Sequence, residues 1–368
     1  MTKKIKKINI FLPSLEKGGV LNIFKNITRY LLNKNIKVHL YTNSYNKIKS
    51  IHNPNLKIFS LKKKAPKDYK SNILNSFLLS LSLIKTVEQN DLVLSMQNHI
   101  VLIFFSFFKK IKIIIRNSEE IFSATKFANN KINGYLILFF KIIFYQFVDK
   151  IIVLSKMSQK SMKKILLNKK KVRLIFNPLL HSEDKKKFKF KNIKKKFSIV
   201  TAGRFVKQKN FELLIKVVNK LSTQKYKIEL TIIGNGKNKD SILAARNNNK
   251  SIKIVPWKKN INNTFKKHNV FIMPSLYEGS PNILVDALNC GIPIIASDCS
   301  GVKDILGNNY KYIFEINNSK QLSDKIIHMM NNYKTVLKVA HKLKKRSNKF
   351  SIQNTKKYLE LFNILQNA

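Results

Sequence analysis

The feature that most constrains the fold of this chain is an alternation of short apolar runs with helical patterns, which occurs twice along its 368 residues. The first series begins at the apolar run Lys6–Leu12 and ends at Val172–Phe176, where Asn177-Pro178 interrupts it. The second begins at Phe197–Ala202. Strands that alternate with helices favour parallel sheets with helices on both faces. The sequence therefore predicts an α/β protein with two doubly wound, Rossmann-like domains facing across a cleft, the default place for a ligand.

Within each series, the periodicity of apolar residues predicts where the elements lie. In the first series we expect helices at 19–33 and 133–147, a further helix capped by Ser155, and strands at Lys37–Thr42, Asp91–Ser95, Ile111–Arg116 and Asp149–Leu154. In the second we expect strands at Lys227–Ile233, Ser251–Val255, Val270–Met273 and Pro293–Ser297. Its helices are expected at Asn210–Leu221, Ile261–Lys267, Pro281–Asn289, Ser319–Asn332 and Ser351–Leu365, the last capped by Ser351.

The clearest change of composition lies between the two series, at His181–Lys196 (HSEDKKKFKFKNIKKK). The lysines of this segment repel one another and it has no sustained apolar face, so we interpret it as an exposed linker. An RNA-binding basic tail is the alternative. The predicted division is a first domain at 1–180, the linker at 181–196, a second domain at 197–345 and a C-terminal helix at 346–368 that packs back toward the first domain.

The chain is strongly basic, with 71 Lys and Arg against 19 Asp and Glu and a formal net charge of +52. Such a chain is attracted to polyanions such as nucleic acid, anionic lipid and phosphorylated substrates. Lysine is abundant throughout the sequence, so we attribute most of this charge to a general residue bias. No zinc-finger spacing, RRM submotif or basic-zipper heptad accompanies it, so no specific nucleic-acid partner is expected. Two cysteines, Cys290 and Cys299, cannot form a disulfide framework, which favours a reduced, cytoplasmic setting.

Two apolar segments raise the question of a membrane. The start of the chain resembles a signal peptide, but Pro13 interrupts its short apolar run, so a first strand fits better. The segment Gly134–Val148 is apolar except for Lys141 near its middle. It fits an amphipathic helix in a membrane surface or a buried helix packed on a sheet, and we favour the buried helix.

Two glycines, Gly18 and Gly19, follow the first predicted strand and precede a helix. Glycine lets backbone amides approach a ligand closely, and a helix N-terminus favours an anion. A strand–helix turn can equally use glycine for its shape alone. The segment is not GxGxxG, and Gly234-Asn235-Gly236 has no third glycine, so neither is a dinucleotide fingerprint.

A second turn, Gly203-Arg204 to Lys209-Asn210, again lies between a strand and a helix. Arg204 and Lys209 can reach the same space above the end of that strand. A guanidinium binds phosphate oxygens with two hydrogen bonds and an ammonium adds a compact positive charge. Together they suit a diphosphate whose negative charge grows as it leaves. The arginine is the more informative of the two, because lysine is the default cation of this chain.

The third feature is the sharpest, and it runs from Pro274 to Leu288 as PSLYEGSPNILVDAL. Ser280 is expected as the N-cap of a helix and Pro281 as its first residue. Glu278 then lies in a loop at the carboxyl end of a strand, while Asp286 lies one to two turns into the helix. Two acids at this spacing can bind hydroxyl groups of a sugar and of a ribose. Acids are scarce in this chain, so two of its 19 in one motif favour a functional role over a solvated surface.

The second half of the chain thus resembles the retaining glycosyltransferases of family 4, which have the GT-B fold and act in surface glycan assembly. The matching stretches are GRFVKQKNFELLI, IIGNG, VFIMPSLYEGSPNILVDALNCGIPIIASD and CSGVKDIL. The combination of a glycine loop, GR-x4-K and E-x7-acid is far more specific than any of its parts. The resemblance covers most of the chain, and it is strongest from 200 to 306.

The resemblance implies that a sugar is transferred from a nucleotide diphosphate sugar, UDP-linked in the simplest case, with retention of configuration. It implies roles for the matched residues. Arg204 and Lys209 would hold the donor diphosphate, Glu278 would lie at the donor sugar and Asp286 would bind the ribose. Backbone amides around Gly203 and Gly279, Ser280, Pro281 and Asn282 would hold sugar and phosphate groups, and Gly18 and Gly19 would form the N-terminal lip of the site. His99 lies where the family often has a histidine near the transferred sugar, although a lone histidine is more often structural.

Two departures from the family pattern bear on activity. The second acid of the family is usually Glu, so Asp286 is one methylene shorter and its ribose contact needs a small shift or a water. The glycine loop of the family usually continues into an acidic residue, where this chain has Val20-Leu21-Asn22. The chain has no Asp-x-Asp pair, so neither a catalytic metal nor another cofactor is expected beside the nucleotide sugar.

The resemblance also implies partners and a place of action. Within the family the acceptor is commonly a growing glycan on a polyprenyl diphosphate. We therefore expect 1–180 to be the acceptor-side domain and 197–345 the nucleotide-sugar domain, in a hexosyl- or N-acetylhexosaminyltransferase in the cytoplasm or at the inner face of the cytoplasmic membrane. Three alternatives stay open: a phosphorylase or phosphate-binding module on the same fold, a basic nucleic-acid-binding protein, and a catalytically impaired relative that only binds sugar nucleotides.

Overall fold

The computed structural model describes residues 4–14, 19–43, 51–61, 73–180, 196–257 and 260–367. The chain divides into two compact units. The first contains 1–125, 130–180 and the C-terminal residues 350–368, and the second contains 126–129 and 181–349. The predicted linker at 181–196 lies outside the described residues except for Lys196.

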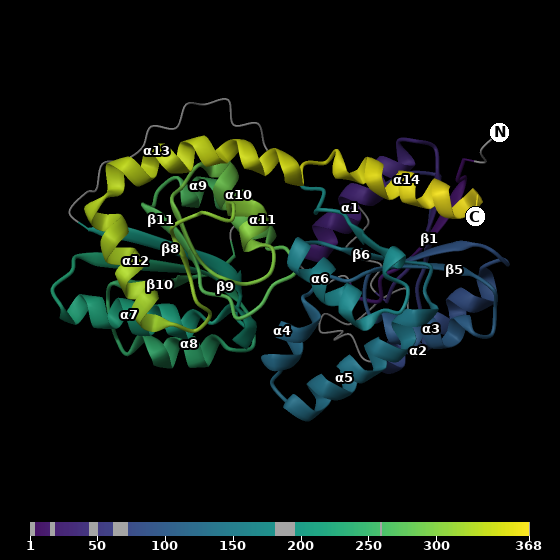
Figure 1. Ribbon diagram of the computed structural model, residues 1–368, viewed down its shortest axis with the longest axis horizontal. Helices are drawn as coiled ribbons and strands as arrows, with labels where there is room; N and C mark the ends of the chain where they lie inside the picture. The colour runs from purple at the N-terminus through teal and green to yellow at the C-terminus, as the bar shows by residue number, and fades with distance from the viewer. Residues whose placement is uncertain are drawn as a thin grey trace. The chain divides into compact units, whose positions relative to one another are not determined.

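The first unit is built on a seven-stranded parallel sheet with the order β3-β2-β1-β4-β5-β6-β7 (Figure 1). The chain order reverses between β1 and β4, which are neighbours in the sheet. Ligands of doubly wound sheets bind beyond the carboxyl ends of the strands at such a reversal. The strands are β1 (Lys7–Phe11), β2 (Lys37–Tyr41), β3 (Leu56–Phe59), β4 (Leu92–Ser95), β5 (Lys112–Arg116), β6 (Lys150–Val153) and β7 (Val172–Leu174).

Helices connect most of these strands. Ser155 caps one of them, as predicted, because its side chain accepts a hydrogen bond from the backbone N–H of Ser158 at 3.1 Å. The helices are α1 (Gly19–Leu32), α2 (Ile73–Thr86), α3 (His99–Ser106), α4 (Ile121–Lys126), α5 (Lys131–Phe144) and α6 (Lys156–Ile165), with 3-10 turns at Tyr145–Phe147 and Lys169–Lys171.

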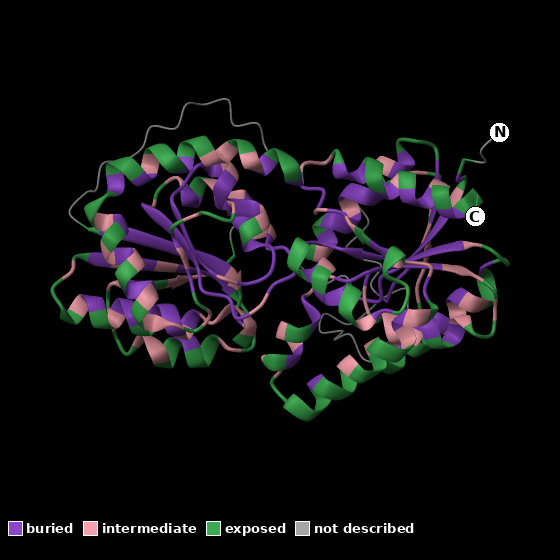
Figure 2. Ribbon diagram, viewed as in Figure 1, coloured by how far each residue is buried: buried purple, intermediate pink, exposed green. Residues whose placement is uncertain are grey.

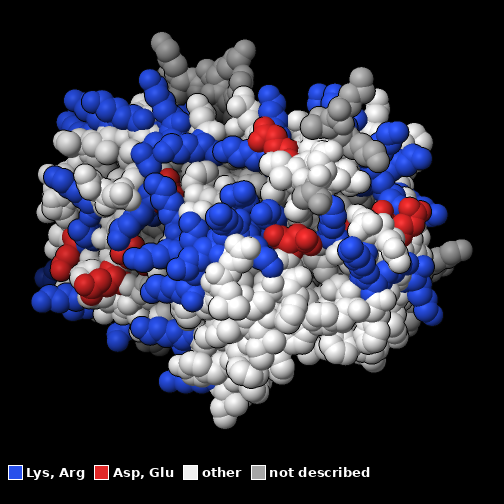
Figure 3. All heavy atoms as spheres, turned by 45° about the vertical axis from the view of Figure 1, so that its right-hand side comes forward, with Lys and Arg blue, Asp and Glu red and all other residues white. Residues whose placement is uncertain are grey.

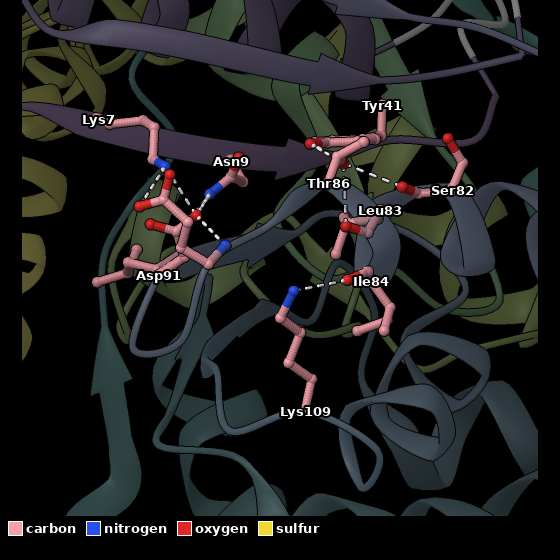
Figure 4. Close-up of polar contacts among 11 residues, drawn as sticks. Lys7, Asn9, Tyr41, Ser82, Leu83, Ile84, Thr86, Asp91 and Lys109 are labelled. Atoms are coloured by element: carbon pink, nitrogen blue, oxygen red, sulfur yellow. Dashed lines mark hydrogen bonds and ion pairs between the residues drawn. The ribbon is translucent and has the colours of Figure 1, made fainter.

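Polar contacts join β1 to the residue before β4, β2 to the helix α2, and α2 to the chain after α3 (Figure 4). At the amino end of β1, Lys7 pairs with Asp91 at 2.9 Å. The Tyr41 hydroxyl at the end of β2 lies 2.7 Å from the Thr86 hydroxyl at the end of α2. The Lys109 ammonium donates to the carbonyl oxygen of Ile84 at 3.1 Å. A cation at the carbonyl end of a helix is also favoured by the helix dipole.

The second unit has a six-stranded parallel sheet with the order β10-β9-β8-β11-β12-β13, and its reversal lies between β8 and β11. This order is that of the dinucleotide-binding fold. The strands are β8 (Phe197–Arg204), β9 (Ile228–Asn235), β10 (Ile252–Val255), β11 (Val270–Met273), β12 (Ile294–Ser297) and β13 (Ile313–Phe314). The helices are α7 (Phe211–Thr223), α8 (Lys239–Arg246), α9 (Ile261–Phe265), α10 (Asn282–Cys290), α11 (Val302–Leu306), α12 (Ser319–Asn331) and α13 (Tyr333–Leu343), with 3-10 turns at Lys207–Lys209 and Lys344–Phe350.

The last helix, α14 (Asn354–Asn367), belongs to the first unit. The Asn363 side chain accepts from the backbone N–H of Ile5 at 3.0 Å, and the Lys112 ammonium donates to the carbonyl oxygen of Leu365 at 2.7 Å. The prediction that Ser351 caps this helix is wrong. Ser351 lies three residues before α14 and forms a β-bridge with Leu179, because the chain enters the first unit there in an extended conformation.

The predicted fold class is confirmed, since both sheets are parallel and doubly wound. The prediction that the apolar segment 134–148 is a buried helix is wrong for most of its length. Of the residues of α5, only Gly134 is buried, and Figure 2 shows this helix as largely exposed. The helix packs along α3, and only Leu138 and Phe144 of its large apolar side chains contact the buried core of the unit. One narrow stripe is therefore covered, and the rest of its apolar surface faces solvent.

Candidate functional site

The candidate site of the second unit lies at the carboxyl ends of β8 and β11, on the two sides of the chain reversal. Arg204 is the last residue of β8, which therefore extends two residues further than the sequence predicts. Lys209 ends the short 3-10 turn that follows. Glu278 lies in the loop after β11. Parallel neighbours end at the same edge of a sheet, so the topology brings these two loops together.

Three hydrogen bonds join the two loops. The backbone N–H of Leu276 donates to the carbonyl oxygen of Gln208 at 2.8 Å. The Gln208 side-chain amide donates in return to the carbonyl oxygen of Tyr277, also at 2.8 Å. Beside them, the Lys209 ammonium binds Glu278 Oε1 at 2.5 Å. This arrangement fixes the spacing of the loops and therefore of the cation and the acid that they carry.

The ion pair between Lys209 and Glu278 is largely sheltered from water. The side chains are 14% and 9% exposed, respectively. Charged hydrogen bonds in such surroundings are stronger than on an open surface, and a lone buried charge would be costly. Two residues that the sequence assigned to the diphosphate and to the donor sugar are thus held against each other.

Glycine at position 203 makes room for the lysine. A Cβ atom there would lie 3.3 Å from Lys209 Cε and 3.3 Å from the ring of Phe211. The neighbouring Gly234 is required more strictly, because its Cβ would lie 1.9 Å from the carbonyl oxygen of Gly203. The glycines of β8 and β9 therefore allow the two strand ends to approach closely, with the aliphatic part of Lys209 lying across Gly203.

The loop that carries Glu278 packs against the end of β12 and the residues that follow it. Gly301 has φ +84°, and a Cβ atom there would lie 2.9 Å from the carbonyl oxygen of Gly279 and 3.0 Å from Ser280 Cα. The Ser300 hydroxyl donates to the same Gly279 oxygen at 3.4 Å. The Ser297 hydroxyl donates to the carbonyl oxygen of Ser275 at 2.6 Å. These backbone contacts position Glu278, and the close approach of the chain at position 301 to Gly279 is possible only for glycine.

The variant Gly301→Ala is expected to destabilise the second unit more than Gly291→Ala does. Both glycines are in the left-handed backbone region, but a Cβ at Gly291 would meet only the His341 side chain, at 3.3 Å from Nδ1. The added clash at Gly301 is expected to lower the free energy of unfolding by a further ~1–3 kcal/mol. Urea denaturation of both variants measures this difference. Equal losses in the two variants would contradict the packing described for this loop.

The helix α10 begins one residue later than the sequence predicts. Its N-cap is Pro281, with ψ 104°, and its first residue is Asn282, so the prediction that Ser280 caps the helix is wrong. The extended backbone of Pro281 ends the loop, and its carbonyl oxygen accepts the first helical hydrogen bond from Leu284. Ser280 and Pro281 are buried and Asn282 is half-buried, all next to Gly279 in the Glu278 loop.

Asp286 lies in the second turn of α10 and is half-buried. Burial raises the pKa of its carboxyl from 3.8 to about 7. Within the part of the chain that the structure describes, Asp286 has no hydrogen-bonding or ion-pair partner. A carboxyl in this condition is close to half-ionised at neutral pH and has its acceptor capacity available for a ligand.

In the first unit, the chain reversal lies between β1 and β4. Gly19 is the first residue of α1, which follows β1, and His99 is the first residue of α3, which follows β4. Gly18 lies outside the described residues. The backbone N–H of Ser14 donates to the Gln97 side chain at 3.2 Å and so links the two turns. The topology therefore places Gly19 and His99 at one edge of this sheet.

His99 is held by several groups. Its Nδ1 lies 2.8 Å from the Ser95 hydroxyl, and its ring meets Tyr145 edge-on at 6.2 Å between centroids. Burial, aided by the charges of Lys141 and Arg116, lowers the pKa of this imidazole to about 3. At neutral pH His99 is uncharged, so it can take part in hydrogen bonding but cannot neutralise a phosphate.

Sequence reasoning missed two residues of the site regions. Gln208 bridges the two loops of the second unit, as described above. Arg116 ends β5 in the first unit and is 1% exposed. Its guanidinium donates to the Tyr358 hydroxyl at 3.2 Å, the Ser118 hydroxyl at 2.7 Å and the Asn177 side chain at 2.6 Å. The signal was present in the sequence, since Arg116 is another arginine at a strand end in a chain whose usual cation is lysine.

The chain is similar in sequence to known glycosyltransferases. Residues 182–350 match the family of group 1 glycosyl transferases. An uncharacterized glycosyltransferase of Methanocaldococcus jannaschii is 29% identical over 222 residues, and the match spans about half of each protein, 53%. A Campylobacter jejuni enzyme, N-acetylgalactosamine-N,N'-diacetylbacillosaminyl-diphospho-undecaprenol 4-alpha-N-acetylgalactosaminyltransferase, is 25% identical over 94% of this chain and 96% of its own length.

The fold of the whole chain is also found among solved structures. The structure of Anabaena HepE in complex with UDP and glucose superposes with a TM-score of 0.75 over 97% of this chain and 99% of that one, at 15% identity. The GT-B-like architecture implied by the sequence is thereby confirmed. Residues 182–350 are similar to the group 1 glycosyl transferases, and the chain as a whole has the two-domain fold of GT-B glycosyltransferases.

Proposed function

We propose that this protein is a retaining glycosyltransferase that moves a hexosyl or N-acetylhexosaminyl group from a UDP-linked sugar to a glycan acceptor. The observation that carries the proposal is the Lys209–Glu278 ion pair at the chain reversal of the second unit, at the edge of the sheet where the exposed Arg204 ends β8. A cation and an acid at this place suit the two parts of a nucleotide diphosphate sugar. The diphosphate needs positive charge, and the sugar hydroxyls need an acceptor.

In the proposed reaction, the bond between the anomeric carbon and the diphosphate oxygen breaks, and the acceptor oxygen bonds to the anomeric carbon from the same face while its proton passes to the departing diphosphate. Arg204 and Lys209 stabilise the negative charge that develops on the departing diphosphate, so a metal ion is not required for that task. Glu278 positions the sugar. It is a poor candidate for a nucleophile, because its carboxylate is already neutralised by Lys209 at 2.5 Å.

The acceptor is proposed to be a glycan on a polyprenyl diphosphate, used in polysaccharide, lipopolysaccharide or glycoconjugate synthesis at the inner face of the cytoplasmic membrane. The Campylobacter relative is named for a diphospho-undecaprenol-linked acceptor, and its similarity extends over nearly the whole chain. The basic character of the chain fits such an anionic substrate.

A panel of nucleotide sugars tests the donor assignment. The full-length protein is heated with UDP-glucose, UDP-galactose, their N-acetylated analogues and the corresponding GDP and ADP sugars. A true donor at 100 times its dissociation constant stabilises the folded state by about 2.7 kcal/mol. Stabilisation by none of these compounds would contradict the proposal.

Turnover then separates the alternatives. A phosphorylase requires inorganic phosphate and releases a sugar phosphate. An impaired relative binds a nucleotide sugar but does not consume it. A nucleic-acid-binding protein shows tight binding of nucleic acid, with a steep dependence on salt, and no turnover.

Donor binding is expected to strengthen as the pH rises through about 7. Above that pH Asp286 is ionised, and a carboxylate accepts hydrogen bonds from ribose hydroxyls more strongly than a carboxylic acid does. Because the donor binds the ionised form better, binding also lowers the pKa of Asp286. The dissociation constant of the donor is therefore expected to fall as the pH rises from about 6 to about 8. Calorimetric titration with the UDP-sugar that stabilises the protein in the panel measures this dissociation constant at each pH. Asp286→Asn is expected to abolish the dependence, and an unchanged dependence in that variant would assign it to another group.

A further inference from the structure

Three helices of the first unit, α2, α3 and α5, expose an unusual amount of apolar surface. We call this surface the three-helix face. The most exposed side chains are Ile73 at 75%, Phe108 at 73% and Ile132 at 72%. The other large apolar side chains exposed on these helices and on the turns after α3 and α5 are Leu74, Phe77, Leu78, Phe104, Phe107, Tyr135, Leu136, Ile137, Phe139, Phe140, Ile142, Ile143 and Phe147. Scattered apolar residues on a surface are ordinary, but a contiguous group of this kind marks a binding surface.

Ring contacts show that the three helices form one surface. The rings of Phe77 on α2 and Phe105 on α3 meet edge-on at 4.7 Å between centroids. Phe107, just after α3, meets Phe147 at 5.0 Å and Phe144 of α5 at 6.4 Å. The Asn98 side chain before α3 donates to the Ser76 hydroxyl of α2 at 2.6 Å. These contacts hold the three helices together as one surface of the first unit.

The three helices of the face carry charges of one sign, and the nearby acids lie outside them: Glu119 pairs with Lys141 of α5 at 2.7 Å, and Glu88 follows α2. The helices α2, α3 and α5 contain no Asp or Glu. Exposed lysines lie at its margins, with Lys85 in the last turn of α2, Lys110 after α3 and Lys131 at the start of α5. Figure 3 shows a broad area without charged groups in the lower part of the molecule, at the height of α5 in Figure 1, with Lys and Arg above it.

No described helix is long and apolar enough to cross a bilayer. The exposed residues also extend over several helices, each between 8 and 14 residues long. Their pattern matches surfaces that lie in the boundary between lipid headgroups and acyl chains, where apolar side chains insert and flanking lysines bind anionic headgroups.

We propose that the three-helix face is a docking surface for an anionic lipid bilayer. Charge favours this occupant over a second copy of the chain. Each copy has a net charge of +52, so pairing two such faces would bring like charges together, whereas an anionic leaflet compensates them. The inference adds to the proposed function, because a lipid-linked acceptor would be met at the same surface, but the binding itself does not depend on catalysis.

The test is sedimentation of the full-length protein with vesicles of phosphatidylcholine containing phosphatidylglycerol, compared with pure phosphatidylcholine. We expect binding to the anionic vesicles that weakens with salt. In the triple variant Ile73→Ser/Phe108→Ser/Ile132→Ser the partition coefficient is expected to fall roughly tenfold or more, because three large side chains no longer insert. A matched triple variant away from the face, Leu180→Ser/Leu243→Ser/Ile364→Ser, removes side chains that are 60%, 41% and 57% exposed and is expected to bind normally.

The lysines give an independent test. Replacing Lys85, Lys110 and Lys131 by glutamine is expected to reduce the salt-sensitive part of binding while the wild-type fold and nucleotide-sugar stabilisation are kept. Absence of binding to anionic vesicles, or equal losses in the two serine triples, overturns the proposal. Concentration-dependent dimerisation in sedimentation velocity that only the face variant abolishes would overturn it in favour of a second copy.

The docking proposal and the proposed function fail separately. If nucleotide sugars stabilise the protein but vesicles do not bind it, the docking surface is wrong and the enzyme assignment stands. If vesicles bind in the manner described and no nucleotide sugar stabilises the protein, the reverse holds.

Discussion

Replacing Arg204 with alanine is expected to lower kcat for sugar transfer by about 10²–10³-fold, which corresponds to about 2.7–4 kcal/mol of lost transition-state stabilisation. Arg204 ends β8 at the chain reversal, where the proposed diphosphate gains negative charge as the sugar departs. Its guanidinium contributes most when that charge is largest, so kcat is expected to fall more than the donor KM rises. Steady-state kinetics with the donor identified by the panel measures both quantities.

The matched control for this variant is Lys207→Ala. Lys207 lies in the same turn, is exposed and carries the same charge. It is expected to change kcat little, because a loss of general positive potential near the site is screened by salt. If Lys207→Ala costs as much as Arg204→Ala, or if Arg204→Ala leaves turnover unchanged, the role assigned to Arg204 is wrong.

The variant Lys209→Met is expected to affect both stability and activity. It leaves the Glu278 carboxylate, whose side chain is 9% exposed, without its cation. Removing one partner of a sheltered ion pair typically costs about 3–5 kcal/mol of unfolding free energy. Turnover is expected to fall by about 10² or more, because the second cation of the diphosphate site is lost as well. Urea denaturation and steady-state kinetics measure the two effects.

The double variant Lys209→Met/Glu278→Gln separates these two effects. A neutral amide has no charge to compensate, so most of the lost stability is expected to return. Activity is not expected to return, because neither the cation nor the acid is restored. Recovery of activity together with stability would show that the pair is only structural, and the donor-binding role would then be abandoned.

The sequence predicted the fold well where an element is wholly buried or buries one clear face. Strands such as β11 (Val270–Met273) are continuous apolar runs, and α7 (Phe211–Thr223) has its apolar residues on one side. It failed where neither pattern is present. β3 (Leu56–Phe59) has no fully buried residue, and α5 (Lys131–Phe144) is apolar on nearly every side. The apolar pattern of a helix does not show whether the rest of the protein or a different environment will cover it. The exposure of α5 could therefore only be seen in the structure.

The candidate site was also predictable only in part. Arg204, Lys209 and Glu278 were found because each follows an apolar run that could be recognised as a strand. Their mutual arrangement could not be predicted, because Lys209 and Glu278 are 69 positions apart and meet only when β8 and β11 pair. The bridging role of Gln208 depends on that pairing too. The start of α10 at Asn282 depends on the backbone of Pro281, which differs by one residue from the expected cap.

The central claim is that the second unit binds a diphosphate through Arg204 and Lys209. Calorimetric titration of the full-length protein with uridine, UMP and UDP, and with the corresponding guanosine and adenosine series, tests it most directly. For the preferred base, the diphosphate is expected to bind at least about tenfold more tightly than the monophosphate, and this difference should vanish in Arg204→Ala. Equal affinity for the nucleoside, monophosphate and diphosphate in the wild-type protein would contradict the account.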